Sequence, residues 1–338
     1  MGIVTSDTSQ PPSGGHPYDR LLPGTVLDAL DGAGYITDGR LLALNSYENR
    51  VYQVGIEGGA PVVAKFYRPG RWSRAAILEE HAFAAELDQH ELPVIAPLAD
   101  ASGTSLLEHA GFLFAVYPRQ GGRAPELDRP EHLAQLGRLL GRLHGIGASR
   151  RFRHRPALTL QDFGHDAVAF LLAHEFVPPE LRPAYESVTA HLLAKLEALF
   201  ARTADLATLR LHGDCHPGNI LWRDGPHFVD LDDARSGPAV QDLWMLLSGP
   251  RADMESQLAV LLEGYTQFRD FDPRELQLIE GLRSLRMLHH SAWLARRWDD
   301  PAFPPSFPWF RLPRYWEDQI LALREQLALL DEPPLAWI

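Results

Sequence analysis

Short apolar runs separated by polar turns dominate the first third of the chain. RVYQVGI (residues 50–56) and PVVAKFYR (residues 61–68) are rich in β-branched and aromatic side chains, and EGGA between them is typical of a hairpin turn. Residues 72–90 instead carry apolar side chains at helical spacing, and prolines follow their end. A third apolar run, residues 111–119, ends near a proline. This order of elements predicts a small lobe of strands and a helix.

Helical periodicity takes over after the glycine-containing break QGGR near residue 120. Residues 131–147 place four leucines on one helical face, and residues 184–201 are amphipathic in the same way. A short β-like run, HFVDLDD (residues 227–233), is followed by further helical patterns. We therefore expect an α+β protein with two lobes, of which the second is larger and mainly helical.

The length of the chain agrees with this division. A chain of 338 residues exceeds the usual size of a single core, and 45% hydrophobic residues are enough to bury two. We expect a β-rich lobe over residues 19–119 and a helical lobe over residues 120–338. Residues 1–18 are polar and rich in Gly, Pro and Ser, which predicts a disordered extension.

Charge and cysteine content narrow the possible partners. The chain has 44 acidic and 32 basic residues, a net charge of -12, and we find no basic run typical of nucleic-acid binding. The single cysteine cannot form an internal disulfide, and neither a secretory signal nor an apolar run of about 18 residues is present. We expect a cytoplasmic monomer without nucleic-acid or membrane partners.

The segment LHGDCHPGNILW (residues 211–222) concentrates reactive side chains. Its His212, Cys215 and His216 could form a metal site, but no matching ligand pair occurs elsewhere, and Cys215 could be a thiol nucleophile. A third interpretation is favoured: Asp214 and Asn219 have the Asp-to-Asn spacing of a kinase catalytic loop. Asp214 would then accept the proton of an attacking hydroxyl, and Asn219 would bind Mg²⁺.

Phosphoryl transfer also needs a carboxylate on the metal, which FVDLDD supplies. Asp230 is our preferred ligand, although strand alternation puts Asp232 on the same face, so the spacing leaves both open. We expect Asp233 to be a turn or cap residue. Asp242, twelve positions after Asp230, is expected to brace the catalytic loop by hydrogen bonds.

Lysine and asparagine are scarce in this sequence, which makes the few that occur informative. Lysine occurs only at Lys65 and Lys195, and Lys65 lies within an apolar strand-like run, as expected for a residue that binds ATP phosphates. Its carboxylate partner would be Glu79 or Glu80 on the following helix, with Glu80 preferred. A glycine-rich loop is missing, and LNSYENRVYQV takes its place. We expect Ser46, with the neighbouring Asn45 and Asn49, to contact ATP phosphates there.

The motifs HGDCHPGNILW, VVAKFYR and FVDLDD resemble the aminoglycoside phosphotransferase/choline kinase branch of the protein-kinase-like superfamily. Longer strings, among them LNSYENRVYQ and GPAVQDLWMLL, resemble the bacterial stress response kinase A family over residues 23–334. The resemblance implies a bilobal kinase-like fold and a Mg²⁺- and ATP-dependent Ser/Thr protein kinase that counters stress. It implies that Asp214 is the proton acceptor, that Asn219 and Asp230 bind magnesium, and that Ser46 lies at the ATP phosphates.

The acceptor is not determined by these motifs. The leading hypothesis is a protein substrate with a Ser or Thr hydroxyl, and the alternative is a small alcohol such as an aminoglycoside or an amino alcohol. A contact-only pseudokinase is disfavoured because Lys65, Asp214, Asn219 and Asp230 are all present. We expect His289 and His290 to be packed helix residues, and residues 298–310 to cover a groove or to pack against the core. A further hypothesis is that Cys215, next to the proposed base, is an oxidation-sensitive switch.

Overall fold

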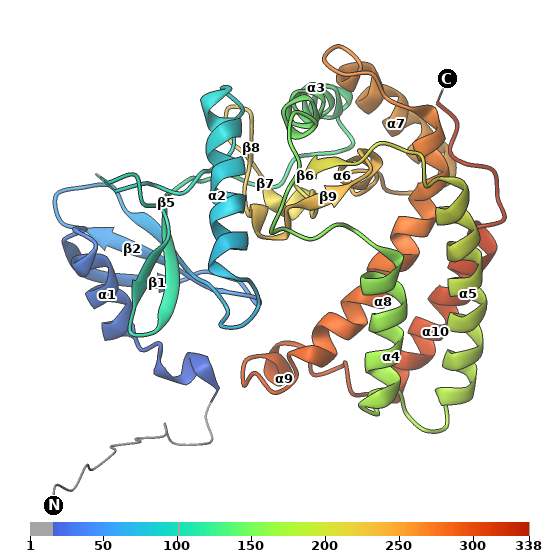
Figure 1. The fold of residues 1–338 in the computed structure, drawn as a ribbon, viewed down its shortest axis with the longest axis horizontal. Coiled ribbons are helices and arrows are strands. Elements are labelled where there is room, and N and C mark those ends of the chain that lie inside the picture. The colour runs from blue at the N-terminus through green and yellow to red at the C-terminus, as the bar shows by residue number, and fades with distance from the viewer. Residues whose placement is uncertain (1–15, 101, 338) are drawn as a thin grey trace, which may run out of the picture.

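The computed structural model describes residues 16–100 and 102–337, and Figure 1 shows a sheet-containing part and a helical part that meet beside α2. The first part is a five-stranded antiparallel sheet in the order β1-β2-β3-β5-β4, with helix α1 (Pro23–Gly32) against it. The strands are β1 (Thr37–Ala43), β2 (Arg50–Ile56), β3 (Val62–Phe66), β4 (Leu107–His109) and β5 (Phe112–Pro118). The α+β class and the two-lobed architecture are confirmed.

Helix α2 (Arg74–Gln89) joins the two parts. It begins where the Ser73 hydroxyl accepts a hydrogen bond from the backbone N–H of Ala76, an N-cap that satisfies one free donor. Ile77, near the start of α2, packs in a small cluster with sheet residues, whereas Phe83 and Leu87 belong to the core of the helical part. One helix therefore contributes to the packing of both lobes.

The helical part surrounds two short strand pairs, in which β6 (Leu209–Leu211) pairs with β9 (Arg235–Gly237) and β7 (Ile220–Trp222) pairs with β8 (Pro226–Phe228). Its helices are α3 (Pro130–Gly147), α4 (Asp166–Ala173), α5 (Arg182–Arg202), α6 (Val240–Trp244), α7 (Arg251–Tyr265), α8 (Ile279–Arg296), α9 (Phe303–Ser306) and α10 (Pro313–Leu329). In the part of the chain that the model covers, no helix combines the length and apolar character needed to cross a membrane.

The expected strands and helices are present, with two differences. The strand expected over residues 227–233 is wrong beyond Phe228: Asp230 has a φ of 60° and a short 3₁₀ helix, Leu231–Asp233, follows. Aspartate tolerates this left-handed conformation better than most residues. The resulting turn lets Asp232 point inward to buried cations, so Asp230 and Asp232 do not share a strand face.

The second difference concerns the expected disordered extension. Residues 1–15 lie outside the described residues, but Pro17–Arg20 form a 3₁₀ helix. The Tyr18 hydroxyl donates to the carbonyl of Phe66 at 3.1 Å, and its ring stacks on Phe112. Disorder is therefore wrong for Pro17 and Tyr18, because an aromatic side chain there joins the core of the sheet. The lobe boundary at residues 119 and 120 stays a prediction.

Candidate active site

A cleft of about 1100 Å³ contains the predicted chemistry. The expected site residues that line it are Ser46, Lys65, Glu80, Asp214, Asn219 and Asp230. They come from the loop before β2, from β3, from α2 and from the two loops at the strand pairs. Segments more than 180 positions apart in sequence, such as Ser46 and Asp230, thus meet in one cavity.

The strand pairs bring the two acidic loops together. β6 and β7 flank the loop of residues 212–219, and β8 and β9 flank the loop of residues 229–234. Gly213 has a φ of 85°, and a Cβ atom there would overlap the carbonyl of Asp233. The catalytic loop can therefore approach the second loop closely only with glycine before Asp214.

Asp242 braces the loop of residues 212–219 by hydrogen bonds, as expected. Its carboxylate accepts hydrogen bonds from the backbone N–H groups of His212 at 2.8 Å and Gly213 at 2.9 Å. His144 of α3 lies 3.1 Å from the same carboxylate, and Asp242 and His144 are both fully buried. A buried carboxylate that accepts several hydrogen bonds gives the loop a defined geometry.

Asp214 lies between the guanidinium of Arg286 and the imidazole of His216. Its Oδ1 is 2.5 Å from Nη1 of Arg286, and its Oδ2 is 3.5 Å from Nε2 of His216. Burial alone would raise the pKa of Asp214, but the contact with His216 and the charge of Arg286 outweigh it and hold the pKa below its ordinary value. Asp214 is thus an ionised carboxylate at neutral pH.

Asn219 is oriented by the same loop. Its Nδ2 donates to the backbone carbonyl of Asp214 at 3.0 Å and lies 3.4 Å from Oδ2 of that residue. This commitment of the amide nitrogen leaves the amide oxygen as the atom available to a ligand. An amide oxygen is a suitable ligand for Mg²⁺, because hard cations prefer oxygen donors.

The three carboxylates of the second loop have different environments. The Asp230 side chain is 51% exposed and lines the cleft, whereas the Asp232 side chain is 4% exposed. Asp232 forms ion pairs with Arg71 and Lys65 and accepts a hydrogen bond from Asn49. This difference in exposure favours Asp230 as the metal ligand.

Asp233 is not simply a turn or cap residue, because it too is paired. It lies 2.9 Å from Arg71 and 2.6 Å from Arg235. Burial would raise the pKa of Asp233, but these two guanidinium groups hold it below its ordinary value. Asp233 therefore anchors the loop electrostatically.

Lys65 pairs with the second loop rather than with α2. Its Nζ lies 2.8 Å from Asp230 and 3.3 Å from Asp232, and within the described residues it forms no ion pair with Glu80. Burial would lower the pKa of Lys65, but the two aspartates raise it well above its ordinary value. The expected Lys65–Glu80 pair is thus wrong for this conformation, in which Asp230 and Asp232 supply the compensating charges.

The two glutamates of α2 have separate environments. Glu80 is buried beside the cleft, and burial raises its pKa to about 7 against the opposing charge of Lys65. Glu79 points away and accepts three backbone hydrogen bonds, from Arg153, His154 and Arg155. Glu79 is therefore not the partner of Lys65; it ties α2 to the chain that follows α3.

The loop before β2 is attached to the opposite lobe. Ser46 lines the cleft, as expected. Asn49 is instead buried and donates a hydrogen bond to Asp232, so the expectation that it contacts ATP phosphates is not supported. Glu48 accepts a hydrogen bond from the Trp293 indole at 2.6 Å and forms an ion pair with Arg297, also at 2.6 Å. Contacts from α8 thus hold the loop that presents Ser46.

The Pro-aromatic segment beside α8 also joins the two lobes. Phe303 and Phe310 are buried, as packing predicts, and Phe307 lines the cleft with its ring 4.8 Å from that of Tyr47. Asp300 is fully buried and pairs with Arg68 at 2.7 Å. The segment therefore packs and closes one end of the groove.

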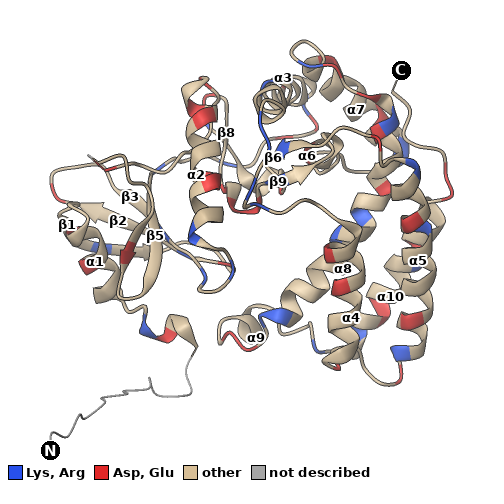
Figure 2. Ribbon diagram, in the orientation of Figure 1, with Lys and Arg blue, Asp and Glu red and all other residues tan. Residues whose placement is uncertain are grey.

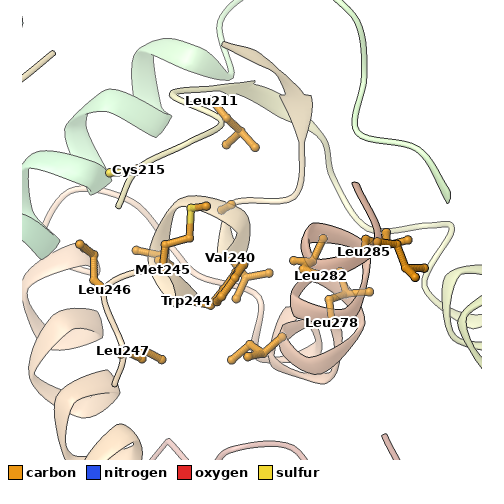
Figure 3. Packing of buried hydrophobic residues seen from close by; sticks show 14 of the residues in the cluster. Leu211, Cys215, Val240, Trp244, Met245, Leu246, Leu247, Leu278, Leu282 and Leu285 are labelled. Carbon is orange, nitrogen blue, oxygen red and sulfur yellow. The ribbon is translucent and has the colours of Figure 1, made fainter. Parts of the chain in front are cut away.

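The alternative chemistries for the catalytic loop find no support. Cys215 is fully buried, and burial raises the pKa of its thiol well above the ordinary value. Figure 3 shows Cys215 near Met245 and Leu246, among buried apolar side chains. The Nε2–H of His212 donates to the carbonyl of Val229 at 2.9 Å, and no group of three or more His, Cys, Asp or Glu side chains that could hold a metal occurs in the described residues. These features contradict a thiol nucleophile.

Helix α8 contributes side chains to the cleft that local motifs do not indicate. Arg286, His290, Trp293 and Arg297 recur at three- and four-residue spacing, line the cleft and include the partners of Asp214 and Glu48. That spacing is a readable signal of one helix face. His289 packs on the Phe163 ring at 4.2 Å, as expected for a packed helix residue, although it also borders the cleft.

Comparison with known proteins places the chain in a family. The model of the phosphotransferase enzyme family matches residues 40–279. This range includes the predicted site residues from Ser46 to Asp230 and the bracing Asp242. The chain belongs to the phosphotransferase enzyme family. Stress response kinase A of Escherichia coli K12 is 48% identical over 94% of this chain and 96% of its own length. The Salmonella typhimurium LT2 protein named serine/threonine protein kinase RdoA matches with the same identity and coverage.

Solved structures of phosphotransferase relatives support the kinase-like fold. An amicoumacin kinase in complex with AMP-PNP, Ca²⁺ and Ami superposes with a TM-score of 0.68 at 20% identity, over 91% of this chain and 93% of that one. A microcompartment-associated aminopropanol kinase gives a TM-score of 0.67 at 18% identity, over 90% and 96%. At these identities the likeness concerns the fold.

Proposed function

We propose that this phosphotransferase-family member is a cytoplasmic, ATP-dependent Ser/Thr protein kinase. The observation that carries the proposal is the meeting of Lys65, Asp214, Asn219 and Asp230 in one cleft. The 48% identity to proteins named as stress response and Ser/Thr protein kinases supports the choice of a protein acceptor. Each of the four residues has a separate role.

Asp214 would orient the acceptor hydroxyl and take its proton. A carboxylate with a lowered pKa is a weak base, but the transition state of phosphoryl transfer is loose and demands little proton removal before the phosphoryl group leaves ATP. Positioning of the hydroxyl then matters more than basicity. Arg286, 2.5 Å from Asp214, would keep the carboxylate ionised and its oxygen directed.

Asn219 and Asp230 would hold Mg²⁺ through an amide oxygen and a carboxylate oxygen. The residues fit the ion, because the Asn219 nitrogen is already bonded to Asp214 and the Asp230 side chain is half exposed to the cleft. When bound, Mg²⁺ would neutralise the charge of the ATP phosphates. Asp232 stays with Lys65 and Arg71, so the lysine keeps a carboxylate partner when Asp230 binds metal.

Lys65 and Ser46 would contact the phosphates of ATP from the smaller lobe. The raised pKa of Lys65 keeps its ammonium charged, which an anion-binding residue requires. Ser46 borders the cleft on a loop held by Glu48. Glu80 lies buried beside this cavity.

A small alcohol remains the second candidate acceptor. Asp162 and Asp166 also line the cleft, and carboxylates at that end suit an amine-bearing alcohol. The relatives of known structure include kinases of amicoumacin and aminopropanol. In contrast, Arg296, which also lines the cleft and donates to the carbonyl of Asp166, suits a peptide with an acidic residue beside its hydroxyl.

The test is transfer of labelled γ-phosphate from ATP with Mg²⁺, with protein substrates and small alcohols offered in parallel. Asp214→Asn keeps the shape of the side chain, and we expect transfer to fall by about 10²- to 10⁴-fold while ATP affinity is retained. Label in protein supports the kinase, and label in an alcohol alone would move the protein to the metabolite kinases. Full transfer by Asp214→Asn would refute the assigned base.

A further inference from the structure

A basic segment leaves α3 in this otherwise acidic protein. Residues 150–155 read RRFRHR, four arginines in six positions of a chain with a net charge of -12. The expectation that the chain has no basic run is therefore wrong at this segment, where Phe152 and His154 interrupt the arginines. Arg150, Arg151 and Arg153 are exposed, whereas Arg155 is buried. Blue stretches on the chain that descends from α3 mark the arginines in Figure 2.

These arginines border a second cavity of about 520 Å³, separate from the active-site cleft. Residues from α2 form one wall, and the basic segment forms the other. The cavity is lined by Glu79, Ala82, Phe83, Glu86, residues 150–153 and Arg210. Phe83 and Phe152 contact each other edge to face at 5.5 Å. Phe83 is buried, with the Arg210 guanidinium over its ring, so the half-buried Phe152 supplies the aromatic surface beside the cationic rim.

The carboxylates in this pocket are already occupied. Glu79 accepts its three backbone hydrogen bonds, and Glu86 pairs with Arg210 at 2.8 Å and with Arg150 at 3.8 Å. In contrast, the side chains of Arg151 and Arg153 form no hydrogen bond or ion pair with the described residues. The rim therefore carries positive charge that the protein itself does not neutralise.

The basic segment is also connected to the metal-binding loop. Arg155 donates from Nε to the carbonyl of Ala234 at 2.8 Å and from Nη2 to the carbonyl of Asp232. These carbonyls follow Asp230 in the same turn. Glu79, which holds the backbone of this segment, is adjacent to Glu80 of the cleft. A ligand on the rim would thus contact a segment bonded to both sides of the active site.

We propose that the pocket between α2 and residues 150–153 is a docking site for an acidic polypeptide. Side chains of Asp, Glu or phosphoserine would pair with Arg151 and Arg153, and an apolar side chain of the same peptide would contact Phe152. Nucleic acid fits less well, because few exposed arginines and a net charge of -12 would face a continuous phosphate backbone. The site differs from the proposed acceptor groove and does not depend on it.

The experiment measures binding of a fluorescein-labelled oligoglutamate peptide to the full-length protein by anisotropy. We expect saturable binding that weakens with salt and falls about tenfold or more in Arg151→Glu/Arg153→Glu. The matched control is Arg20→Glu/Arg324→Glu, which makes the same charge change at two other exposed arginines and should bind like the unmodified protein. If charge reversal unfolds the protein by its melting curve, Arg151→Gln/Arg153→Gln replaces it.

Three results would overturn the proposal. Equal loss in both double variants would mean that only net charge matters. Equally tight binding of an RNA oligonucleotide would indicate a nucleic-acid surface, and full competition by pyrophosphate at equimolar concentration would indicate a small-anion site. Because the measurement requires no phosphoryl transfer, its outcome is separate from that of the proposed kinase activity.

Discussion

The catalytic loop (residues 212–219) and the loop before β2 (residues 44–49) line the same cleft, but different contacts hold them. Asp242 and His144, both fully buried, support the catalytic loop from within the core of its own lobe. The loop before β2 is held on one side by Arg68 of its own lobe, which pairs with Glu48 at 2.9 Å, and on the other by Trp293 and Arg297 of α8, which also contact Glu48. If the lobes separate, the contacts of Asp242 remain, whereas the contacts between Glu48 and α8 break. The candidate catalytic side is therefore preformed, and the Ser46 side gains part of its support only when the lobes are closed.

Removal of Asp242 should give the largest effect. Asp242→Ala leaves two backbone N–H groups and His144 without their acceptor in a fully buried position. We expect the free energy of unfolding to fall by about 3–5 kcal/mol and transfer to be lost. Urea denaturation and labelled-phosphate transfer measure both. Asp270→Ala, at an exposed position, is the control, and a loss of less than 1 kcal/mol from Asp242→Ala, roughly that of one exposed pair, would contradict a rigid catalytic side.

Glu275 supports α6, the helix that carries Asp242, at its N-terminal end. Its carboxyl group accepts a hydrogen bond from the backbone N–H of Val240 at 2.8 Å. Burial raises its pKa from 4.5 to about 7. Between these values the folded protein retains a proton that the unfolded chain has released, so the free energy of unfolding decreases as pH rises, by up to about 1.4 kcal/mol per pH unit.

Glu275→Gln should remove this pH dependence. The variant and the unmodified protein are expected to be about equally stable at pH 4.5, and the variant to be more stable by about 1–3 kcal/mol at pH 8. Denaturation curves at both values measure the difference, with the exposed Glu263→Gln as control. A difference that is the same at both values would show that Glu275 titrates normally.

Loss of Glu48 should affect nucleotide binding more than stability. Glu48→Gln removes the charge that attracts Arg297 and Arg68, so the loop carrying Ser46 must be ordered when ATP binds. We expect the KM for ATP to rise by about three- to tenfold, with a smaller rise at high salt because ion pairs are screened. Glu57→Gln, in the exposed turn after β2, is the control. An unchanged KM for ATP would show that the contacts of Glu48 do not position the loop that carries Ser46.

The contrast between contacts within one lobe and contacts between the lobes also explains which features the sequence could predict. The sequence singles out Asp214, Asn219 and Lys65 as candidates because residue type at local spacing indicates them, and the structure places all three at one cleft. The strands and helices around them follow local periodicity. The partner of Lys65 was not found, because the choice between Glu80 and Asp230 depends on a tertiary approach between lobes. Contacts of Arg286 and Glu48 span 72 and 249 positions, and local pattern carries no record of such pairs.

Asp232 shows the physical limit most clearly. If the strand continued through residue 232, Asp230 and Asp232 would lie on the same face, and the sequence pattern could not distinguish them. The left-handed residue Asp230 ends that period and sends Asp232 to Arg71 and Lys65. A single backbone dihedral thus separates the exposed carboxylate from the buried one.

The smallest effect is expected at Cys215, on the preformed side. Because burial raises the pKa of its thiol and no surface of the side chain is exposed, we expect native protein to resist iodoacetamide and peroxide inactivation to be the same in Cys215→Ser. The chain has one cysteine, so a single mass increase of the intact protein reports its alkylation. Labelling in urea is the positive control. Rapid labelling of the native protein would mean that the catalytic loop opens, which would place it with the loop before β2 among the parts that depend on lobe closure.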